Sequence, residues 1–211
     1  SAQMVRFAKN GSDATSACIR IARAHTKKDY IICCGYHGWQ DWYIGTTTRS
    51  IGVPKSVKKL SLKVKYNDLD EIKRILKKYK GRIAAMIMEP SNFENPNKNY
   101  FKNLKSILKK NNILLIFDEI CTGFRMSIGG AQKFFNITPD LSAFGKAMGN
   151  GMPISAVVGK RKLMNNLENV FFSTTFSGET LSIAAAIETI NFIKRKKVIK
   201  NIWKKGNYLK K

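Results

Sequence analysis

The chain has 211 residues, of which 44% are hydrophobic, which is enough for one large globular domain and too little for a second full one. The formal net charge of +24 would suit a nucleic-acid partner, but the lysines are spread over nearly every predicted helix and form no concentrated face. We therefore expect no nucleic-acid binding, and the basic balance favours an anionic substrate.

The four cysteines, Cys18, Cys33, Cys34 and Cys121, form neither a CxxC pair nor a spacing typical of zinc sites. We interpret them as reduced, mostly buried thiols of a cytoplasmic protein and predict no metal site. No apolar run is long enough to span a bilayer, and no signal peptide is recognisable. Both ends of the sequence are abrupt, so we expect it to be a piece of a longer protein.

The first predicted elements are a short strand over residues 4–8 and a helix over about 10–25. Gly11, Ser12 and Asp13 lie where this helix begins. Glycine, a hydroxyl and an acid at a helix start leave backbone N–H groups facing whatever lies beyond the strand, as in a phosphate site. Ordinary helix capping by Ser12 or Asp13 explains the same pattern.

A buried strand over residues 30–34 leads into an aromatic loop, GYHGWQDWY. Tyr36 in this loop is placed to stack on a flat ligand, and a packed loop without a ligand accounts for the same composition. His37 is one of only two histidines, and its spacing to other ligand types indicates no metal. Residues 45–54 are polar and turn-rich, which is typical of a surface or active-site loop.

Strands and helices alternate along the rest of the chain. Further strands are predicted over 57–66, 83–88, 113–117, 140–144 and 154–159. Further helices are predicted over about 67–80, 100–110, 161–167 and 181–193. No repeat or linker interrupts the series. The alternation predicts a single α/β domain with a mainly parallel sheet and helices on both faces.

Two of these strands end in residues that carry chemistry. The strand over 113–117 runs into Asp118 and Glu119, and the strand over 140–144 is followed by Lys146. Ligands of open α/β sheets bind beyond the carboxyl ends of the strands, so one carboxylate and one lysine would face a common crevice. Pyridoxal phosphate (PLP) needs an amine for a Schiff base and an acid for its pyridinium nitrogen. Taken alone, Lys146 is better explained as a surface lysine in a glycine-rich turn, because the chain has so many lysines.

The segment IFDEICTGFRMSIGGAQKFFNITPDLSAFGKAMGNGMP resembles the core of class III PLP-dependent aminotransferases, most of all the glutamate-1-semialdehyde 2,1-aminomutase branch. NGSDAT, GYHG, MEP and TTFSG follow the family's order, so the resemblance covers almost the whole chain. It implies the large domain of the fold-type I PLP-dependent transferases over residues 1–211. It also implies that an N-terminal segment and a C-terminal small domain of the family are absent from this sequence.

The resemblance further implies roles for single residues. Lys146 would hold PLP as a Schiff base and move a proton between the substrate and the cofactor. Asp118 would pair with the pyridinium nitrogen, so that the ring can accept electrons. Gly11 and Ser12 would bind the phosphate, and Tyr36 would lie against the ring.

Thr175 resembles the threonine that reaches the phosphate of the neighbouring subunit's cofactor, which implies a homodimer with shared active sites. Further candidates share a position near a strand end or in the aromatic loop: His37, Glu89, Asn92 or Asn95, and Glu119. For Glu119 a structural role beside the site is an open alternative to a catalytic one.

The resemblance implies a transaminase or 2,1-aminomutase that acts on a small amino or carbonyl substrate. The amino group would move between carbons of one substrate, or from an amino-acid donor to an aldehyde or ketone, including sugar-derived ones. A non-catalytic remnant of the fold is the third alternative. The presence of Asp118, Lys146 and Thr175 argues against a remnant.

Overall fold

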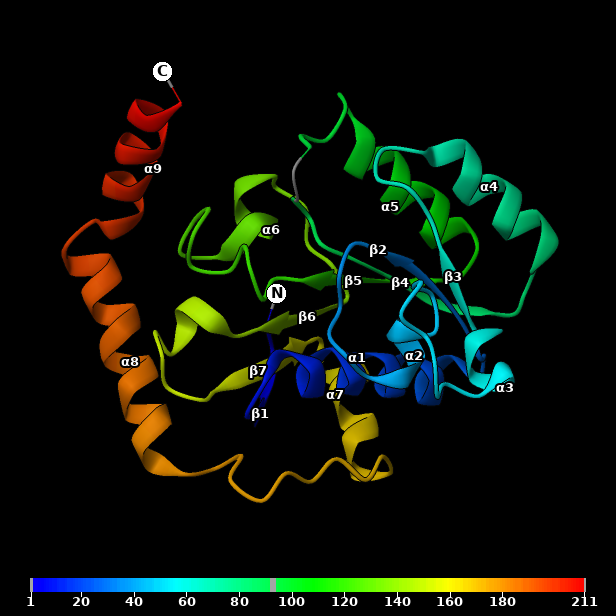
Figure 1. Cartoon of the computed structure of the whole chain (residues 1–211), viewed down its shortest axis with the longest axis horizontal. Coiled ribbons are helices and arrows are strands. Elements are labelled where there is room, and N and C mark those ends of the chain that lie inside the picture. Colours follow the sequence, from blue (N-terminus) through cyan, green and yellow to red (C-terminus); the bar gives the residue numbers. More distant parts are fainter. Residues whose placement is uncertain (1, 92–93, 211) are drawn as a thin grey trace.

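The computed structural model describes residues 2–91 and 94–210 of the chain. Its centre is a seven-stranded sheet with the order β1-β7-β6-β5-β4-β2-β3 (Figure 1). The strands are β1 (Met4–Ala8), β2 (Tyr30–Cys34), β3 (Ser61–Lys63), β4 (Ile83–Met88), β5 (Leu114–Asp118), β6 (Leu141–Phe144) and β7 (Ser155–Gly159). The prediction of a mainly parallel sheet is confirmed.

Strand β7 is the exception, because it pairs antiparallel with both β1 and β6. A parallel neighbour of β6 would need a crossover of a dozen or more residues. The connection from Phe144 to Ser155 contains only a short 3-10 helix, η1 (Lys146–Met148), so the chain turns back on itself. The strand was predicted from the sequence, and its direction was not.

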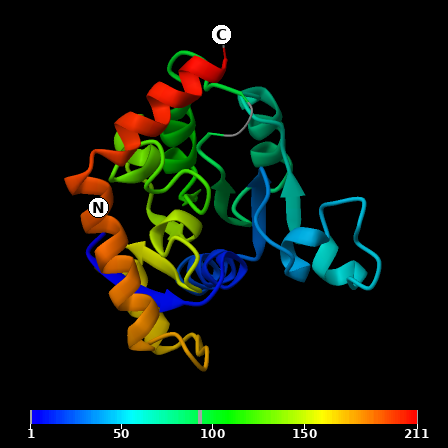
Figure 2. The same cartoon turned by 60° about the vertical axis from the view of Figure 1, so that its left-hand side comes forward.

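Helices cover both faces of the sheet (Figures 1 and 2). The helices that contribute most to these two layers are α1 (Gly11–Thr26), α4 (Leu69–Lys78), α5 (Tyr100–Lys110) and α7 (Arg161–Met164). Helices α1 and α7 bury their apolar sides on one face, and α4 and α5 on the other. The alternation along β5 shows why both faces need a cover: Ile116 belongs to the α1 side, whereas Leu115 and Phe117 belong to the α4–α5 side.

The remaining helical segments lie in connections or at the sheet edge: α2 (Asp41–Ile44), α3 (Lys55–Lys58), α6 (Gly130–Phe134), η2 (Asn165–Glu168), α8 (Thr180–Arg195) and α9 (Val198–Leu209). Helix α8 packs through Ala186 on a small cluster that contains Met148 from η1. Helix α9, red in Figure 1, was not predicted. Within the described part of the chain, no helix has the length and apolarity needed to cross a membrane.

Candidate active site

A cavity of about 310 Å³ opens between the start of α1 and the loops that follow β2, β5 and β6. The predicted site residues Gly11, Ser12, Tyr36, His37, Glu89, Asp118 and Lys146 all line it, although they lie far apart in the sequence. Glu119 and Thr175 do not line it, and Asn92 falls outside the described residues. The carboxyl ends of the parallel strands therefore meet at a cavity, as the sequence predicts.

The start of α1 forms the polar end of this cavity. The Asn10 side chain caps the helix by accepting a hydrogen bond from the Asp13 amide at 3.0 Å. The Asn10 carbonyl accepts from the amide of Ala14. The N–H groups of Gly11 and Ser12 have no acceptor inside the helix by its geometry, so they remain available to an anion. Capping and anion binding are thus compatible, because capping engages Asp13 and not the two residues before it.

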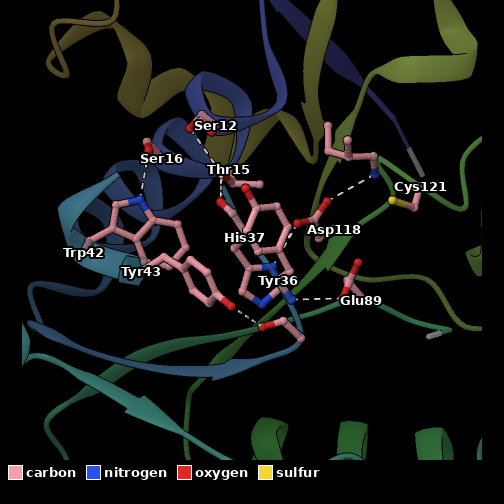
Figure 3. A network of polar contacts seen from close by, with 12 residues as sticks. Ser12, Thr15, Ser16, Tyr36, His37, Trp42, Tyr43, Glu89, Asp118 and Cys121 are labelled. Atoms are coloured by element: carbon pink, nitrogen blue, oxygen red, sulfur yellow. Dashed lines mark hydrogen bonds and ion pairs between the residues drawn. The ribbon is translucent and has the colours of Figure 1, made fainter. Parts of the chain in front are cut away.

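Gly38 brings the aromatic loop against this helix start. Its φ of +99° lies in the region that favours glycine, and a Cβ at this position would overlap the Ser12 hydroxyl. The loop is tied further by Thr15, whose hydroxyl donates to the His37 carbonyl at 2.9 Å (Figure 3). The second glycine of GYHG therefore sets the close approach of β2's loop to α1.

Asp118 and His37 form a buried pair at the base of the cavity (Figure 3). His37 Nδ1 lies 2.8 Å from Asp118 Oδ2, and the two residues are only 1% and 3% exposed. Asp118 Oδ1 also accepts a hydrogen bond from the amide of Ile120 at 3.1 Å. An ionised carboxylate can only accept, so Nδ1 of His37 carries the shared hydrogen. The pair fixes the carboxylate at the end of β5 and supplies a negative group that a cationic ring nitrogen would complement.

Aromatic side chains hold His37 in place. Its ring stacks on Trp42, with centroids 6.2 Å apart, and meets the edge of Tyr43 at 5.2 Å. Trp42 Nε1 donates to the Ser16 hydroxyl at 2.8 Å, and the Tyr43 hydroxyl donates to the Gly35 carbonyl at 2.8 Å (Figure 3). His37 Nε2 is buried without a hydrogen-bond partner among the described residues.

Tyr36 and Glu89 meet at the side of the cavity. Tyr36 is 58% exposed, and its backbone amide donates to Glu89 Oε2 at 2.9 Å. Gly35 permits this contact, since a Cβ there would lie 2.5 Å from the same oxygen. Burial raises the pKa of the Glu89 carboxyl above its ordinary value of 4.5, and the nearby Asp118 charge adds to the rise. The Tyr36 amide and the charges of His37 and Lys146 act in the opposite direction.

This raised pKa predicts a pH-dependent contribution to stability. The folded chain holds the Glu89 proton more tightly than the unfolded chain, so the contribution of Glu89 is most favourable below pH 4.5 and is lost as the pH rises through the folded pKa. Glu89→Gln should abolish this trend. Denaturant unfolding of the cofactor-free full-length protein would be measured from pH 4 to 8. The free energy of unfolding of the variant should increase relative to that of the wild type as the pH rises. If the free energies of unfolding of wild type and variant change with pH in the same way, the prediction is wrong. Glu168→Gln is the matched control, because Glu168 is exposed.

Lys146 lies at the start of η1, directly beyond the end of β6. Its backbone has a φ of +40°, which is uncommon outside glycine and typical of functional positions. Its Nζ donates to Cys121 Sγ at 3.1 Å. Strands β5 and β6 are parallel neighbours with Asp118 opposite Ala143, which brings the Asp118 and Lys146 ends of the two strands to the same cavity.

Glu119 is fully buried and faces away from the cavity toward its own loop. Its carboxylate accepts hydrogen bonds from the Thr122 hydroxyl at 2.5 Å and from the amides of Ala131 and Gln132 at 2.8 and 2.9 Å. Gly130 next to these donors leaves no room for a side chain, because its Cβ would lie 2.6 Å from Glu119 Oε1. The geometry gives Glu119 a structural role: it fastens the long loop that follows β5.

Glu119→Gln should lower the free energy of unfolding by about 1–3 kcal/mol, because one amide donor would face other donors in a buried site. Urea unfolding of the full-length protein would measure this loss. Glu188→Gln is the control, since its ion pair with Arg195 is exposed and should contribute less than about 1 kcal/mol. Equal stability of the two variants would exclude the structural role.

Thr175 lies in the segment between η2 and α8, where a turn begins, and is exposed. This segment is held to α1 by Arg20, whose Nη1 donates to the Phe171 carbonyl at 3.0 Å. Large apolar side chains flank it, with Phe171 82% and Phe176 65% exposed. Within one chain Thr175 therefore stands apart from the cavity, and its predicted contact with a neighbouring subunit stays a prediction.

The structure adds residues to the site that sequence reasoning did not select. Thr15, Ile120 and Cys121 line the cavity, and so does Lys9, which pairs with Glu179 at 2.6 Å. Only their position in the sequence could have indicated them, because each lies within three residues of a predicted site residue at a strand or helix end. No composition rule separates them from ordinary core and surface residues, so only the fold reveals them.

The chain is similar to known proteins over its whole length. The sequence model of the family described as aminotransferase class-III matches residues 1–211. A 3-aminobutyryl-CoA aminotransferase of Cloacimonas acidaminovorans is 42% identical over 211 residues, which are 97% of this chain and 50% of that protein. A glutamate-1-semialdehyde 2,1-aminomutase of Archaeoglobus fulgidus is 37% identical over 220 residues, which are 96% of this chain and 52% of that protein.

Solved structures agree with these similarities. An omega-transaminase from Sphaerobacter thermophilus superposes with a TM-score of 0.84 and 26% identity, covering 92% of this chain and 50% of that one. The PLP internal aldimine form of the FumI protein from Sphingopyxis sp. MTA144 gives a TM-score of 0.84 and 32% identity, covering 92% of this chain and 48% of that one. The chain thus spans about half the length of the relatives that it matches.

Proposed function

Because this chain belongs to the class-III aminotransferase family, we propose that it is the cofactor-binding part of a PLP-dependent enzyme that moves an amino group. The observation that supports the proposal most strongly is that Lys146, Asp118 and the start of α1 line the same cavity. An amine, a buried carboxylate and an anion-binding helix start are the groups that PLP requires. The predicted family membership is confirmed, and the enzyme's activity is our proposal.

The cavity residues fit PLP on three independent features. The Gly11 and Ser12 amides at the helix start suit a phosphate. Gly38 lets the aromatic loop after β2 pack against Ser12 at this end of the cavity. The Asp118–His37 pair supplies a fixed carboxylate in a buried setting, where an ion pair is stronger than in water. The exposed ring of Tyr36 offers an aromatic face at the cavity wall.

When bound, PLP supplies an aldehyde that links to amines and a ring that accepts an electron pair from the substrate carbon. Asp118 would hold the proton on the ring nitrogen, and His37 would keep the Asp118 carboxylate oriented through Nδ1. Lys146 Nζ would bind the cofactor covalently and, once displaced by the substrate amine, carry a proton to or from the substrate carbon. Tyr36 would cover one face of the ring.

Two reactions remain as candidates for this chemistry. The similarity to glutamate-1-semialdehyde 2,1-aminomutases supports movement of the amino group within one substrate. The 42% identity to a 3-aminobutyryl-CoA aminotransferase supports transfer from a donor to a separate carbonyl acceptor. A sugar-derived aldehyde or ketone remains a candidate acceptor. A non-catalytic remnant is disfavoured, because the cavity keeps Asp118 and Lys146 together.

Donor dependence separates the two reactions. The full-length protein, loaded with PLP, would be given glutamate 1-semialdehyde alone and then 3-oxobutyryl-CoA with and without glutamate, with products followed by mass spectrometry. Conversion of the amino aldehyde without any donor would establish the mutase. Amination of a carbonyl acceptor only with glutamate or a similar donor would establish the transaminase. Absence of any amino-group movement over a wide substrate panel would contradict the proposal.

We further propose a cytoplasmic homodimer with shared active sites. The free state of all four cysteines supports a reducing compartment. The exposed Thr175 and its apolar neighbours Phe171 and Phe176 support a subunit contact along the segment before α8. Sedimentation of the full-length protein, with a charged substitution at Phe176, would test the contact.

A further inference from the structure

The loop after β5 brings a thiol into the cavity. Cys121 lines the same space as Lys146, and its side chain is exposed. The Lys146 Nζ donates a hydrogen bond to its Sγ at 3.1 Å. The other three cysteines are buried, and burial raises the thiol pKa of Cys33 and of Cys34 to about 12. Cys121 is therefore the described thiol that a water-soluble reagent reaches first.

The backbone on both sides of this contact is well fixed. On the Cys121 side, Glu119 fastens the loop through its buried hydrogen bonds, and its carbonyl accepts from the Gly123 amide at 2.7 Å. On the Lys146 side, the turn is closed by hydrogen bonds from Met148 to Gly145 at 2.9 Å and from Asn150 to Lys146 at 3.1 Å. The main freedom left is in the lysine side chain, whose rotatable bonds carry considerable entropy.

We propose that Cys121 is a positioning residue for Lys146. Its sulfur accepts a hydrogen bond from Nζ and holds the amine inside the cavity before the cofactor is attached. The proposal rests on the proposed function, in which PLP attaches at Lys146. In that step the neutral amine bonds to the aldehyde carbon, its two hydrogens leave with the aldehyde oxygen as water, and a C=N bond results. A restrained amine meets that carbon more often than a mobile one.

The chemistry of the thiol suits this role. A neutral amine that donates one hydrogen to sulfur keeps its lone pair for the bond to carbon. A thiol is a weak acceptor, so it restrains Nζ without competing strongly once the cofactor arrives. A carboxylate in the same place would bind the ammonium form and slow the attachment. The alternative is that Cys121 only fills space at the cavity wall.

Two substitutions distinguish these roles. Cys121→Ser keeps a small hydrogen-bond acceptor, and Cys121→Ala removes it with little change in volume. In the full-length protein freed of cofactor, stopped-flow absorbance would give the rate of PLP attachment. Pyridoxine 5′-phosphate, which has an alcohol in place of the aldehyde, would report binding without attachment.

We expect the alanine variant to attach PLP about fivefold more slowly than the wild type, as the loss of one weak hydrogen bond implies, and the serine variant to stay within about twofold. All three proteins should bind pyridoxine 5′-phosphate equally well. Attachment by the alanine variant at the wild-type rate would overturn the inference. An equal loss of pyridoxine 5′-phosphate affinity would also overturn it, since it indicates a space-filling role.

Alkylation gives an independent readout. Iodoacetamide joins its methylene carbon to Sγ, while iodide and the thiol proton are released, and the added group keeps Nζ away from Sγ and crowds the cavity. The modified protein should attach PLP more slowly, and the Cys121→Ser variant should be insensitive to the reagent. Unchanged attachment after complete modification would contradict the inference. Failure of the untreated wild type to attach PLP at all would instead refute the proposed function.

Discussion

Lys146→Ala in the full-length protein is expected to abolish covalent binding of PLP and to lower the rate of amino-group movement at least about a thousandfold, because the covalent step loses its nucleophile. Lys146 Nζ is the amine that the fold delivers to the cavity beside Asp118. Both the visible absorbance of the bound cofactor and the turnover rate would be measured. The structure predicts loss of both together, since one atom serves attachment and proton movement.

The control for Lys146→Ala is Lys102→Ala. Lys102 is exposed on α5, on the opposite side of the sheet from α1, so its removal should leave absorbance and rate unchanged. Added methylamine should restore part of the rate in the Lys146 variant, because a small amine can enter the vacated space and accept the proton. An active Lys146→Ala enzyme with an unchanged absorbance band would contradict the assignment.

Asp118→Asn is expected to lower the rate at least about a hundredfold, as the loss of a buried, oriented charge at a reacting group does in other enzymes. The asparagine keeps the size of the side chain and an oxygen for the Ile120 amide, so the backbone should hold its place. It removes the negative charge that would complement a protonated ring nitrogen. The loss should therefore appear mainly in the rate of the chemical step, with a smaller loss in cofactor affinity.

Asp140→Asn is the matched control for Asp118→Asn. Asp140 lies just before β6, at the opposite end of that strand from Lys146, and its carboxylate accepts from the Leu115 amide and pairs with Lys160 at 2.7 Å. Its substitution should lower stability and spare the rate per folded molecule. If the two variants lose rate equally, the Asp118 carboxylate has no special role. Steady-state rates and unfolding curves on the same preparations would decide this.

The convergence of Asp118 and Lys146 was predictable from the sequence for a simple physical reason. Buried parallel strands are apolar runs, and the residue after each run emerges at the same edge of the sheet. The runs that became β5 and β6 are such strands, and they are neighbours in the sheet. The pairing of Asp118 with His37 was not predictable in this way, because it depends on the left-handed turn conformations of Gly35 and Gly38.

Helix α9 was missed although Val198, Ile199, Ile202 and Trp203 recur at helical spacing along it. It buries none of its residues within this chain. It is held instead by Trp203, whose ring stacks on Phe134 at 6.0 Å and whose Nε1 donates to the Arg125 carbonyl. Such single long-range contacts are set by the tertiary structure, and local sequence does not encode them.

The most direct test of the account is to find the lysine that carries the cofactor. The full-length wild-type protein, loaded with PLP, would be reduced with borohydride, digested and mapped by mass spectrometry. We predict one reduced adduct, on Lys146, among the many lysines of this chain. An adduct on another lysine, or no adduct in a protein that has bound PLP, would contradict the proposed site.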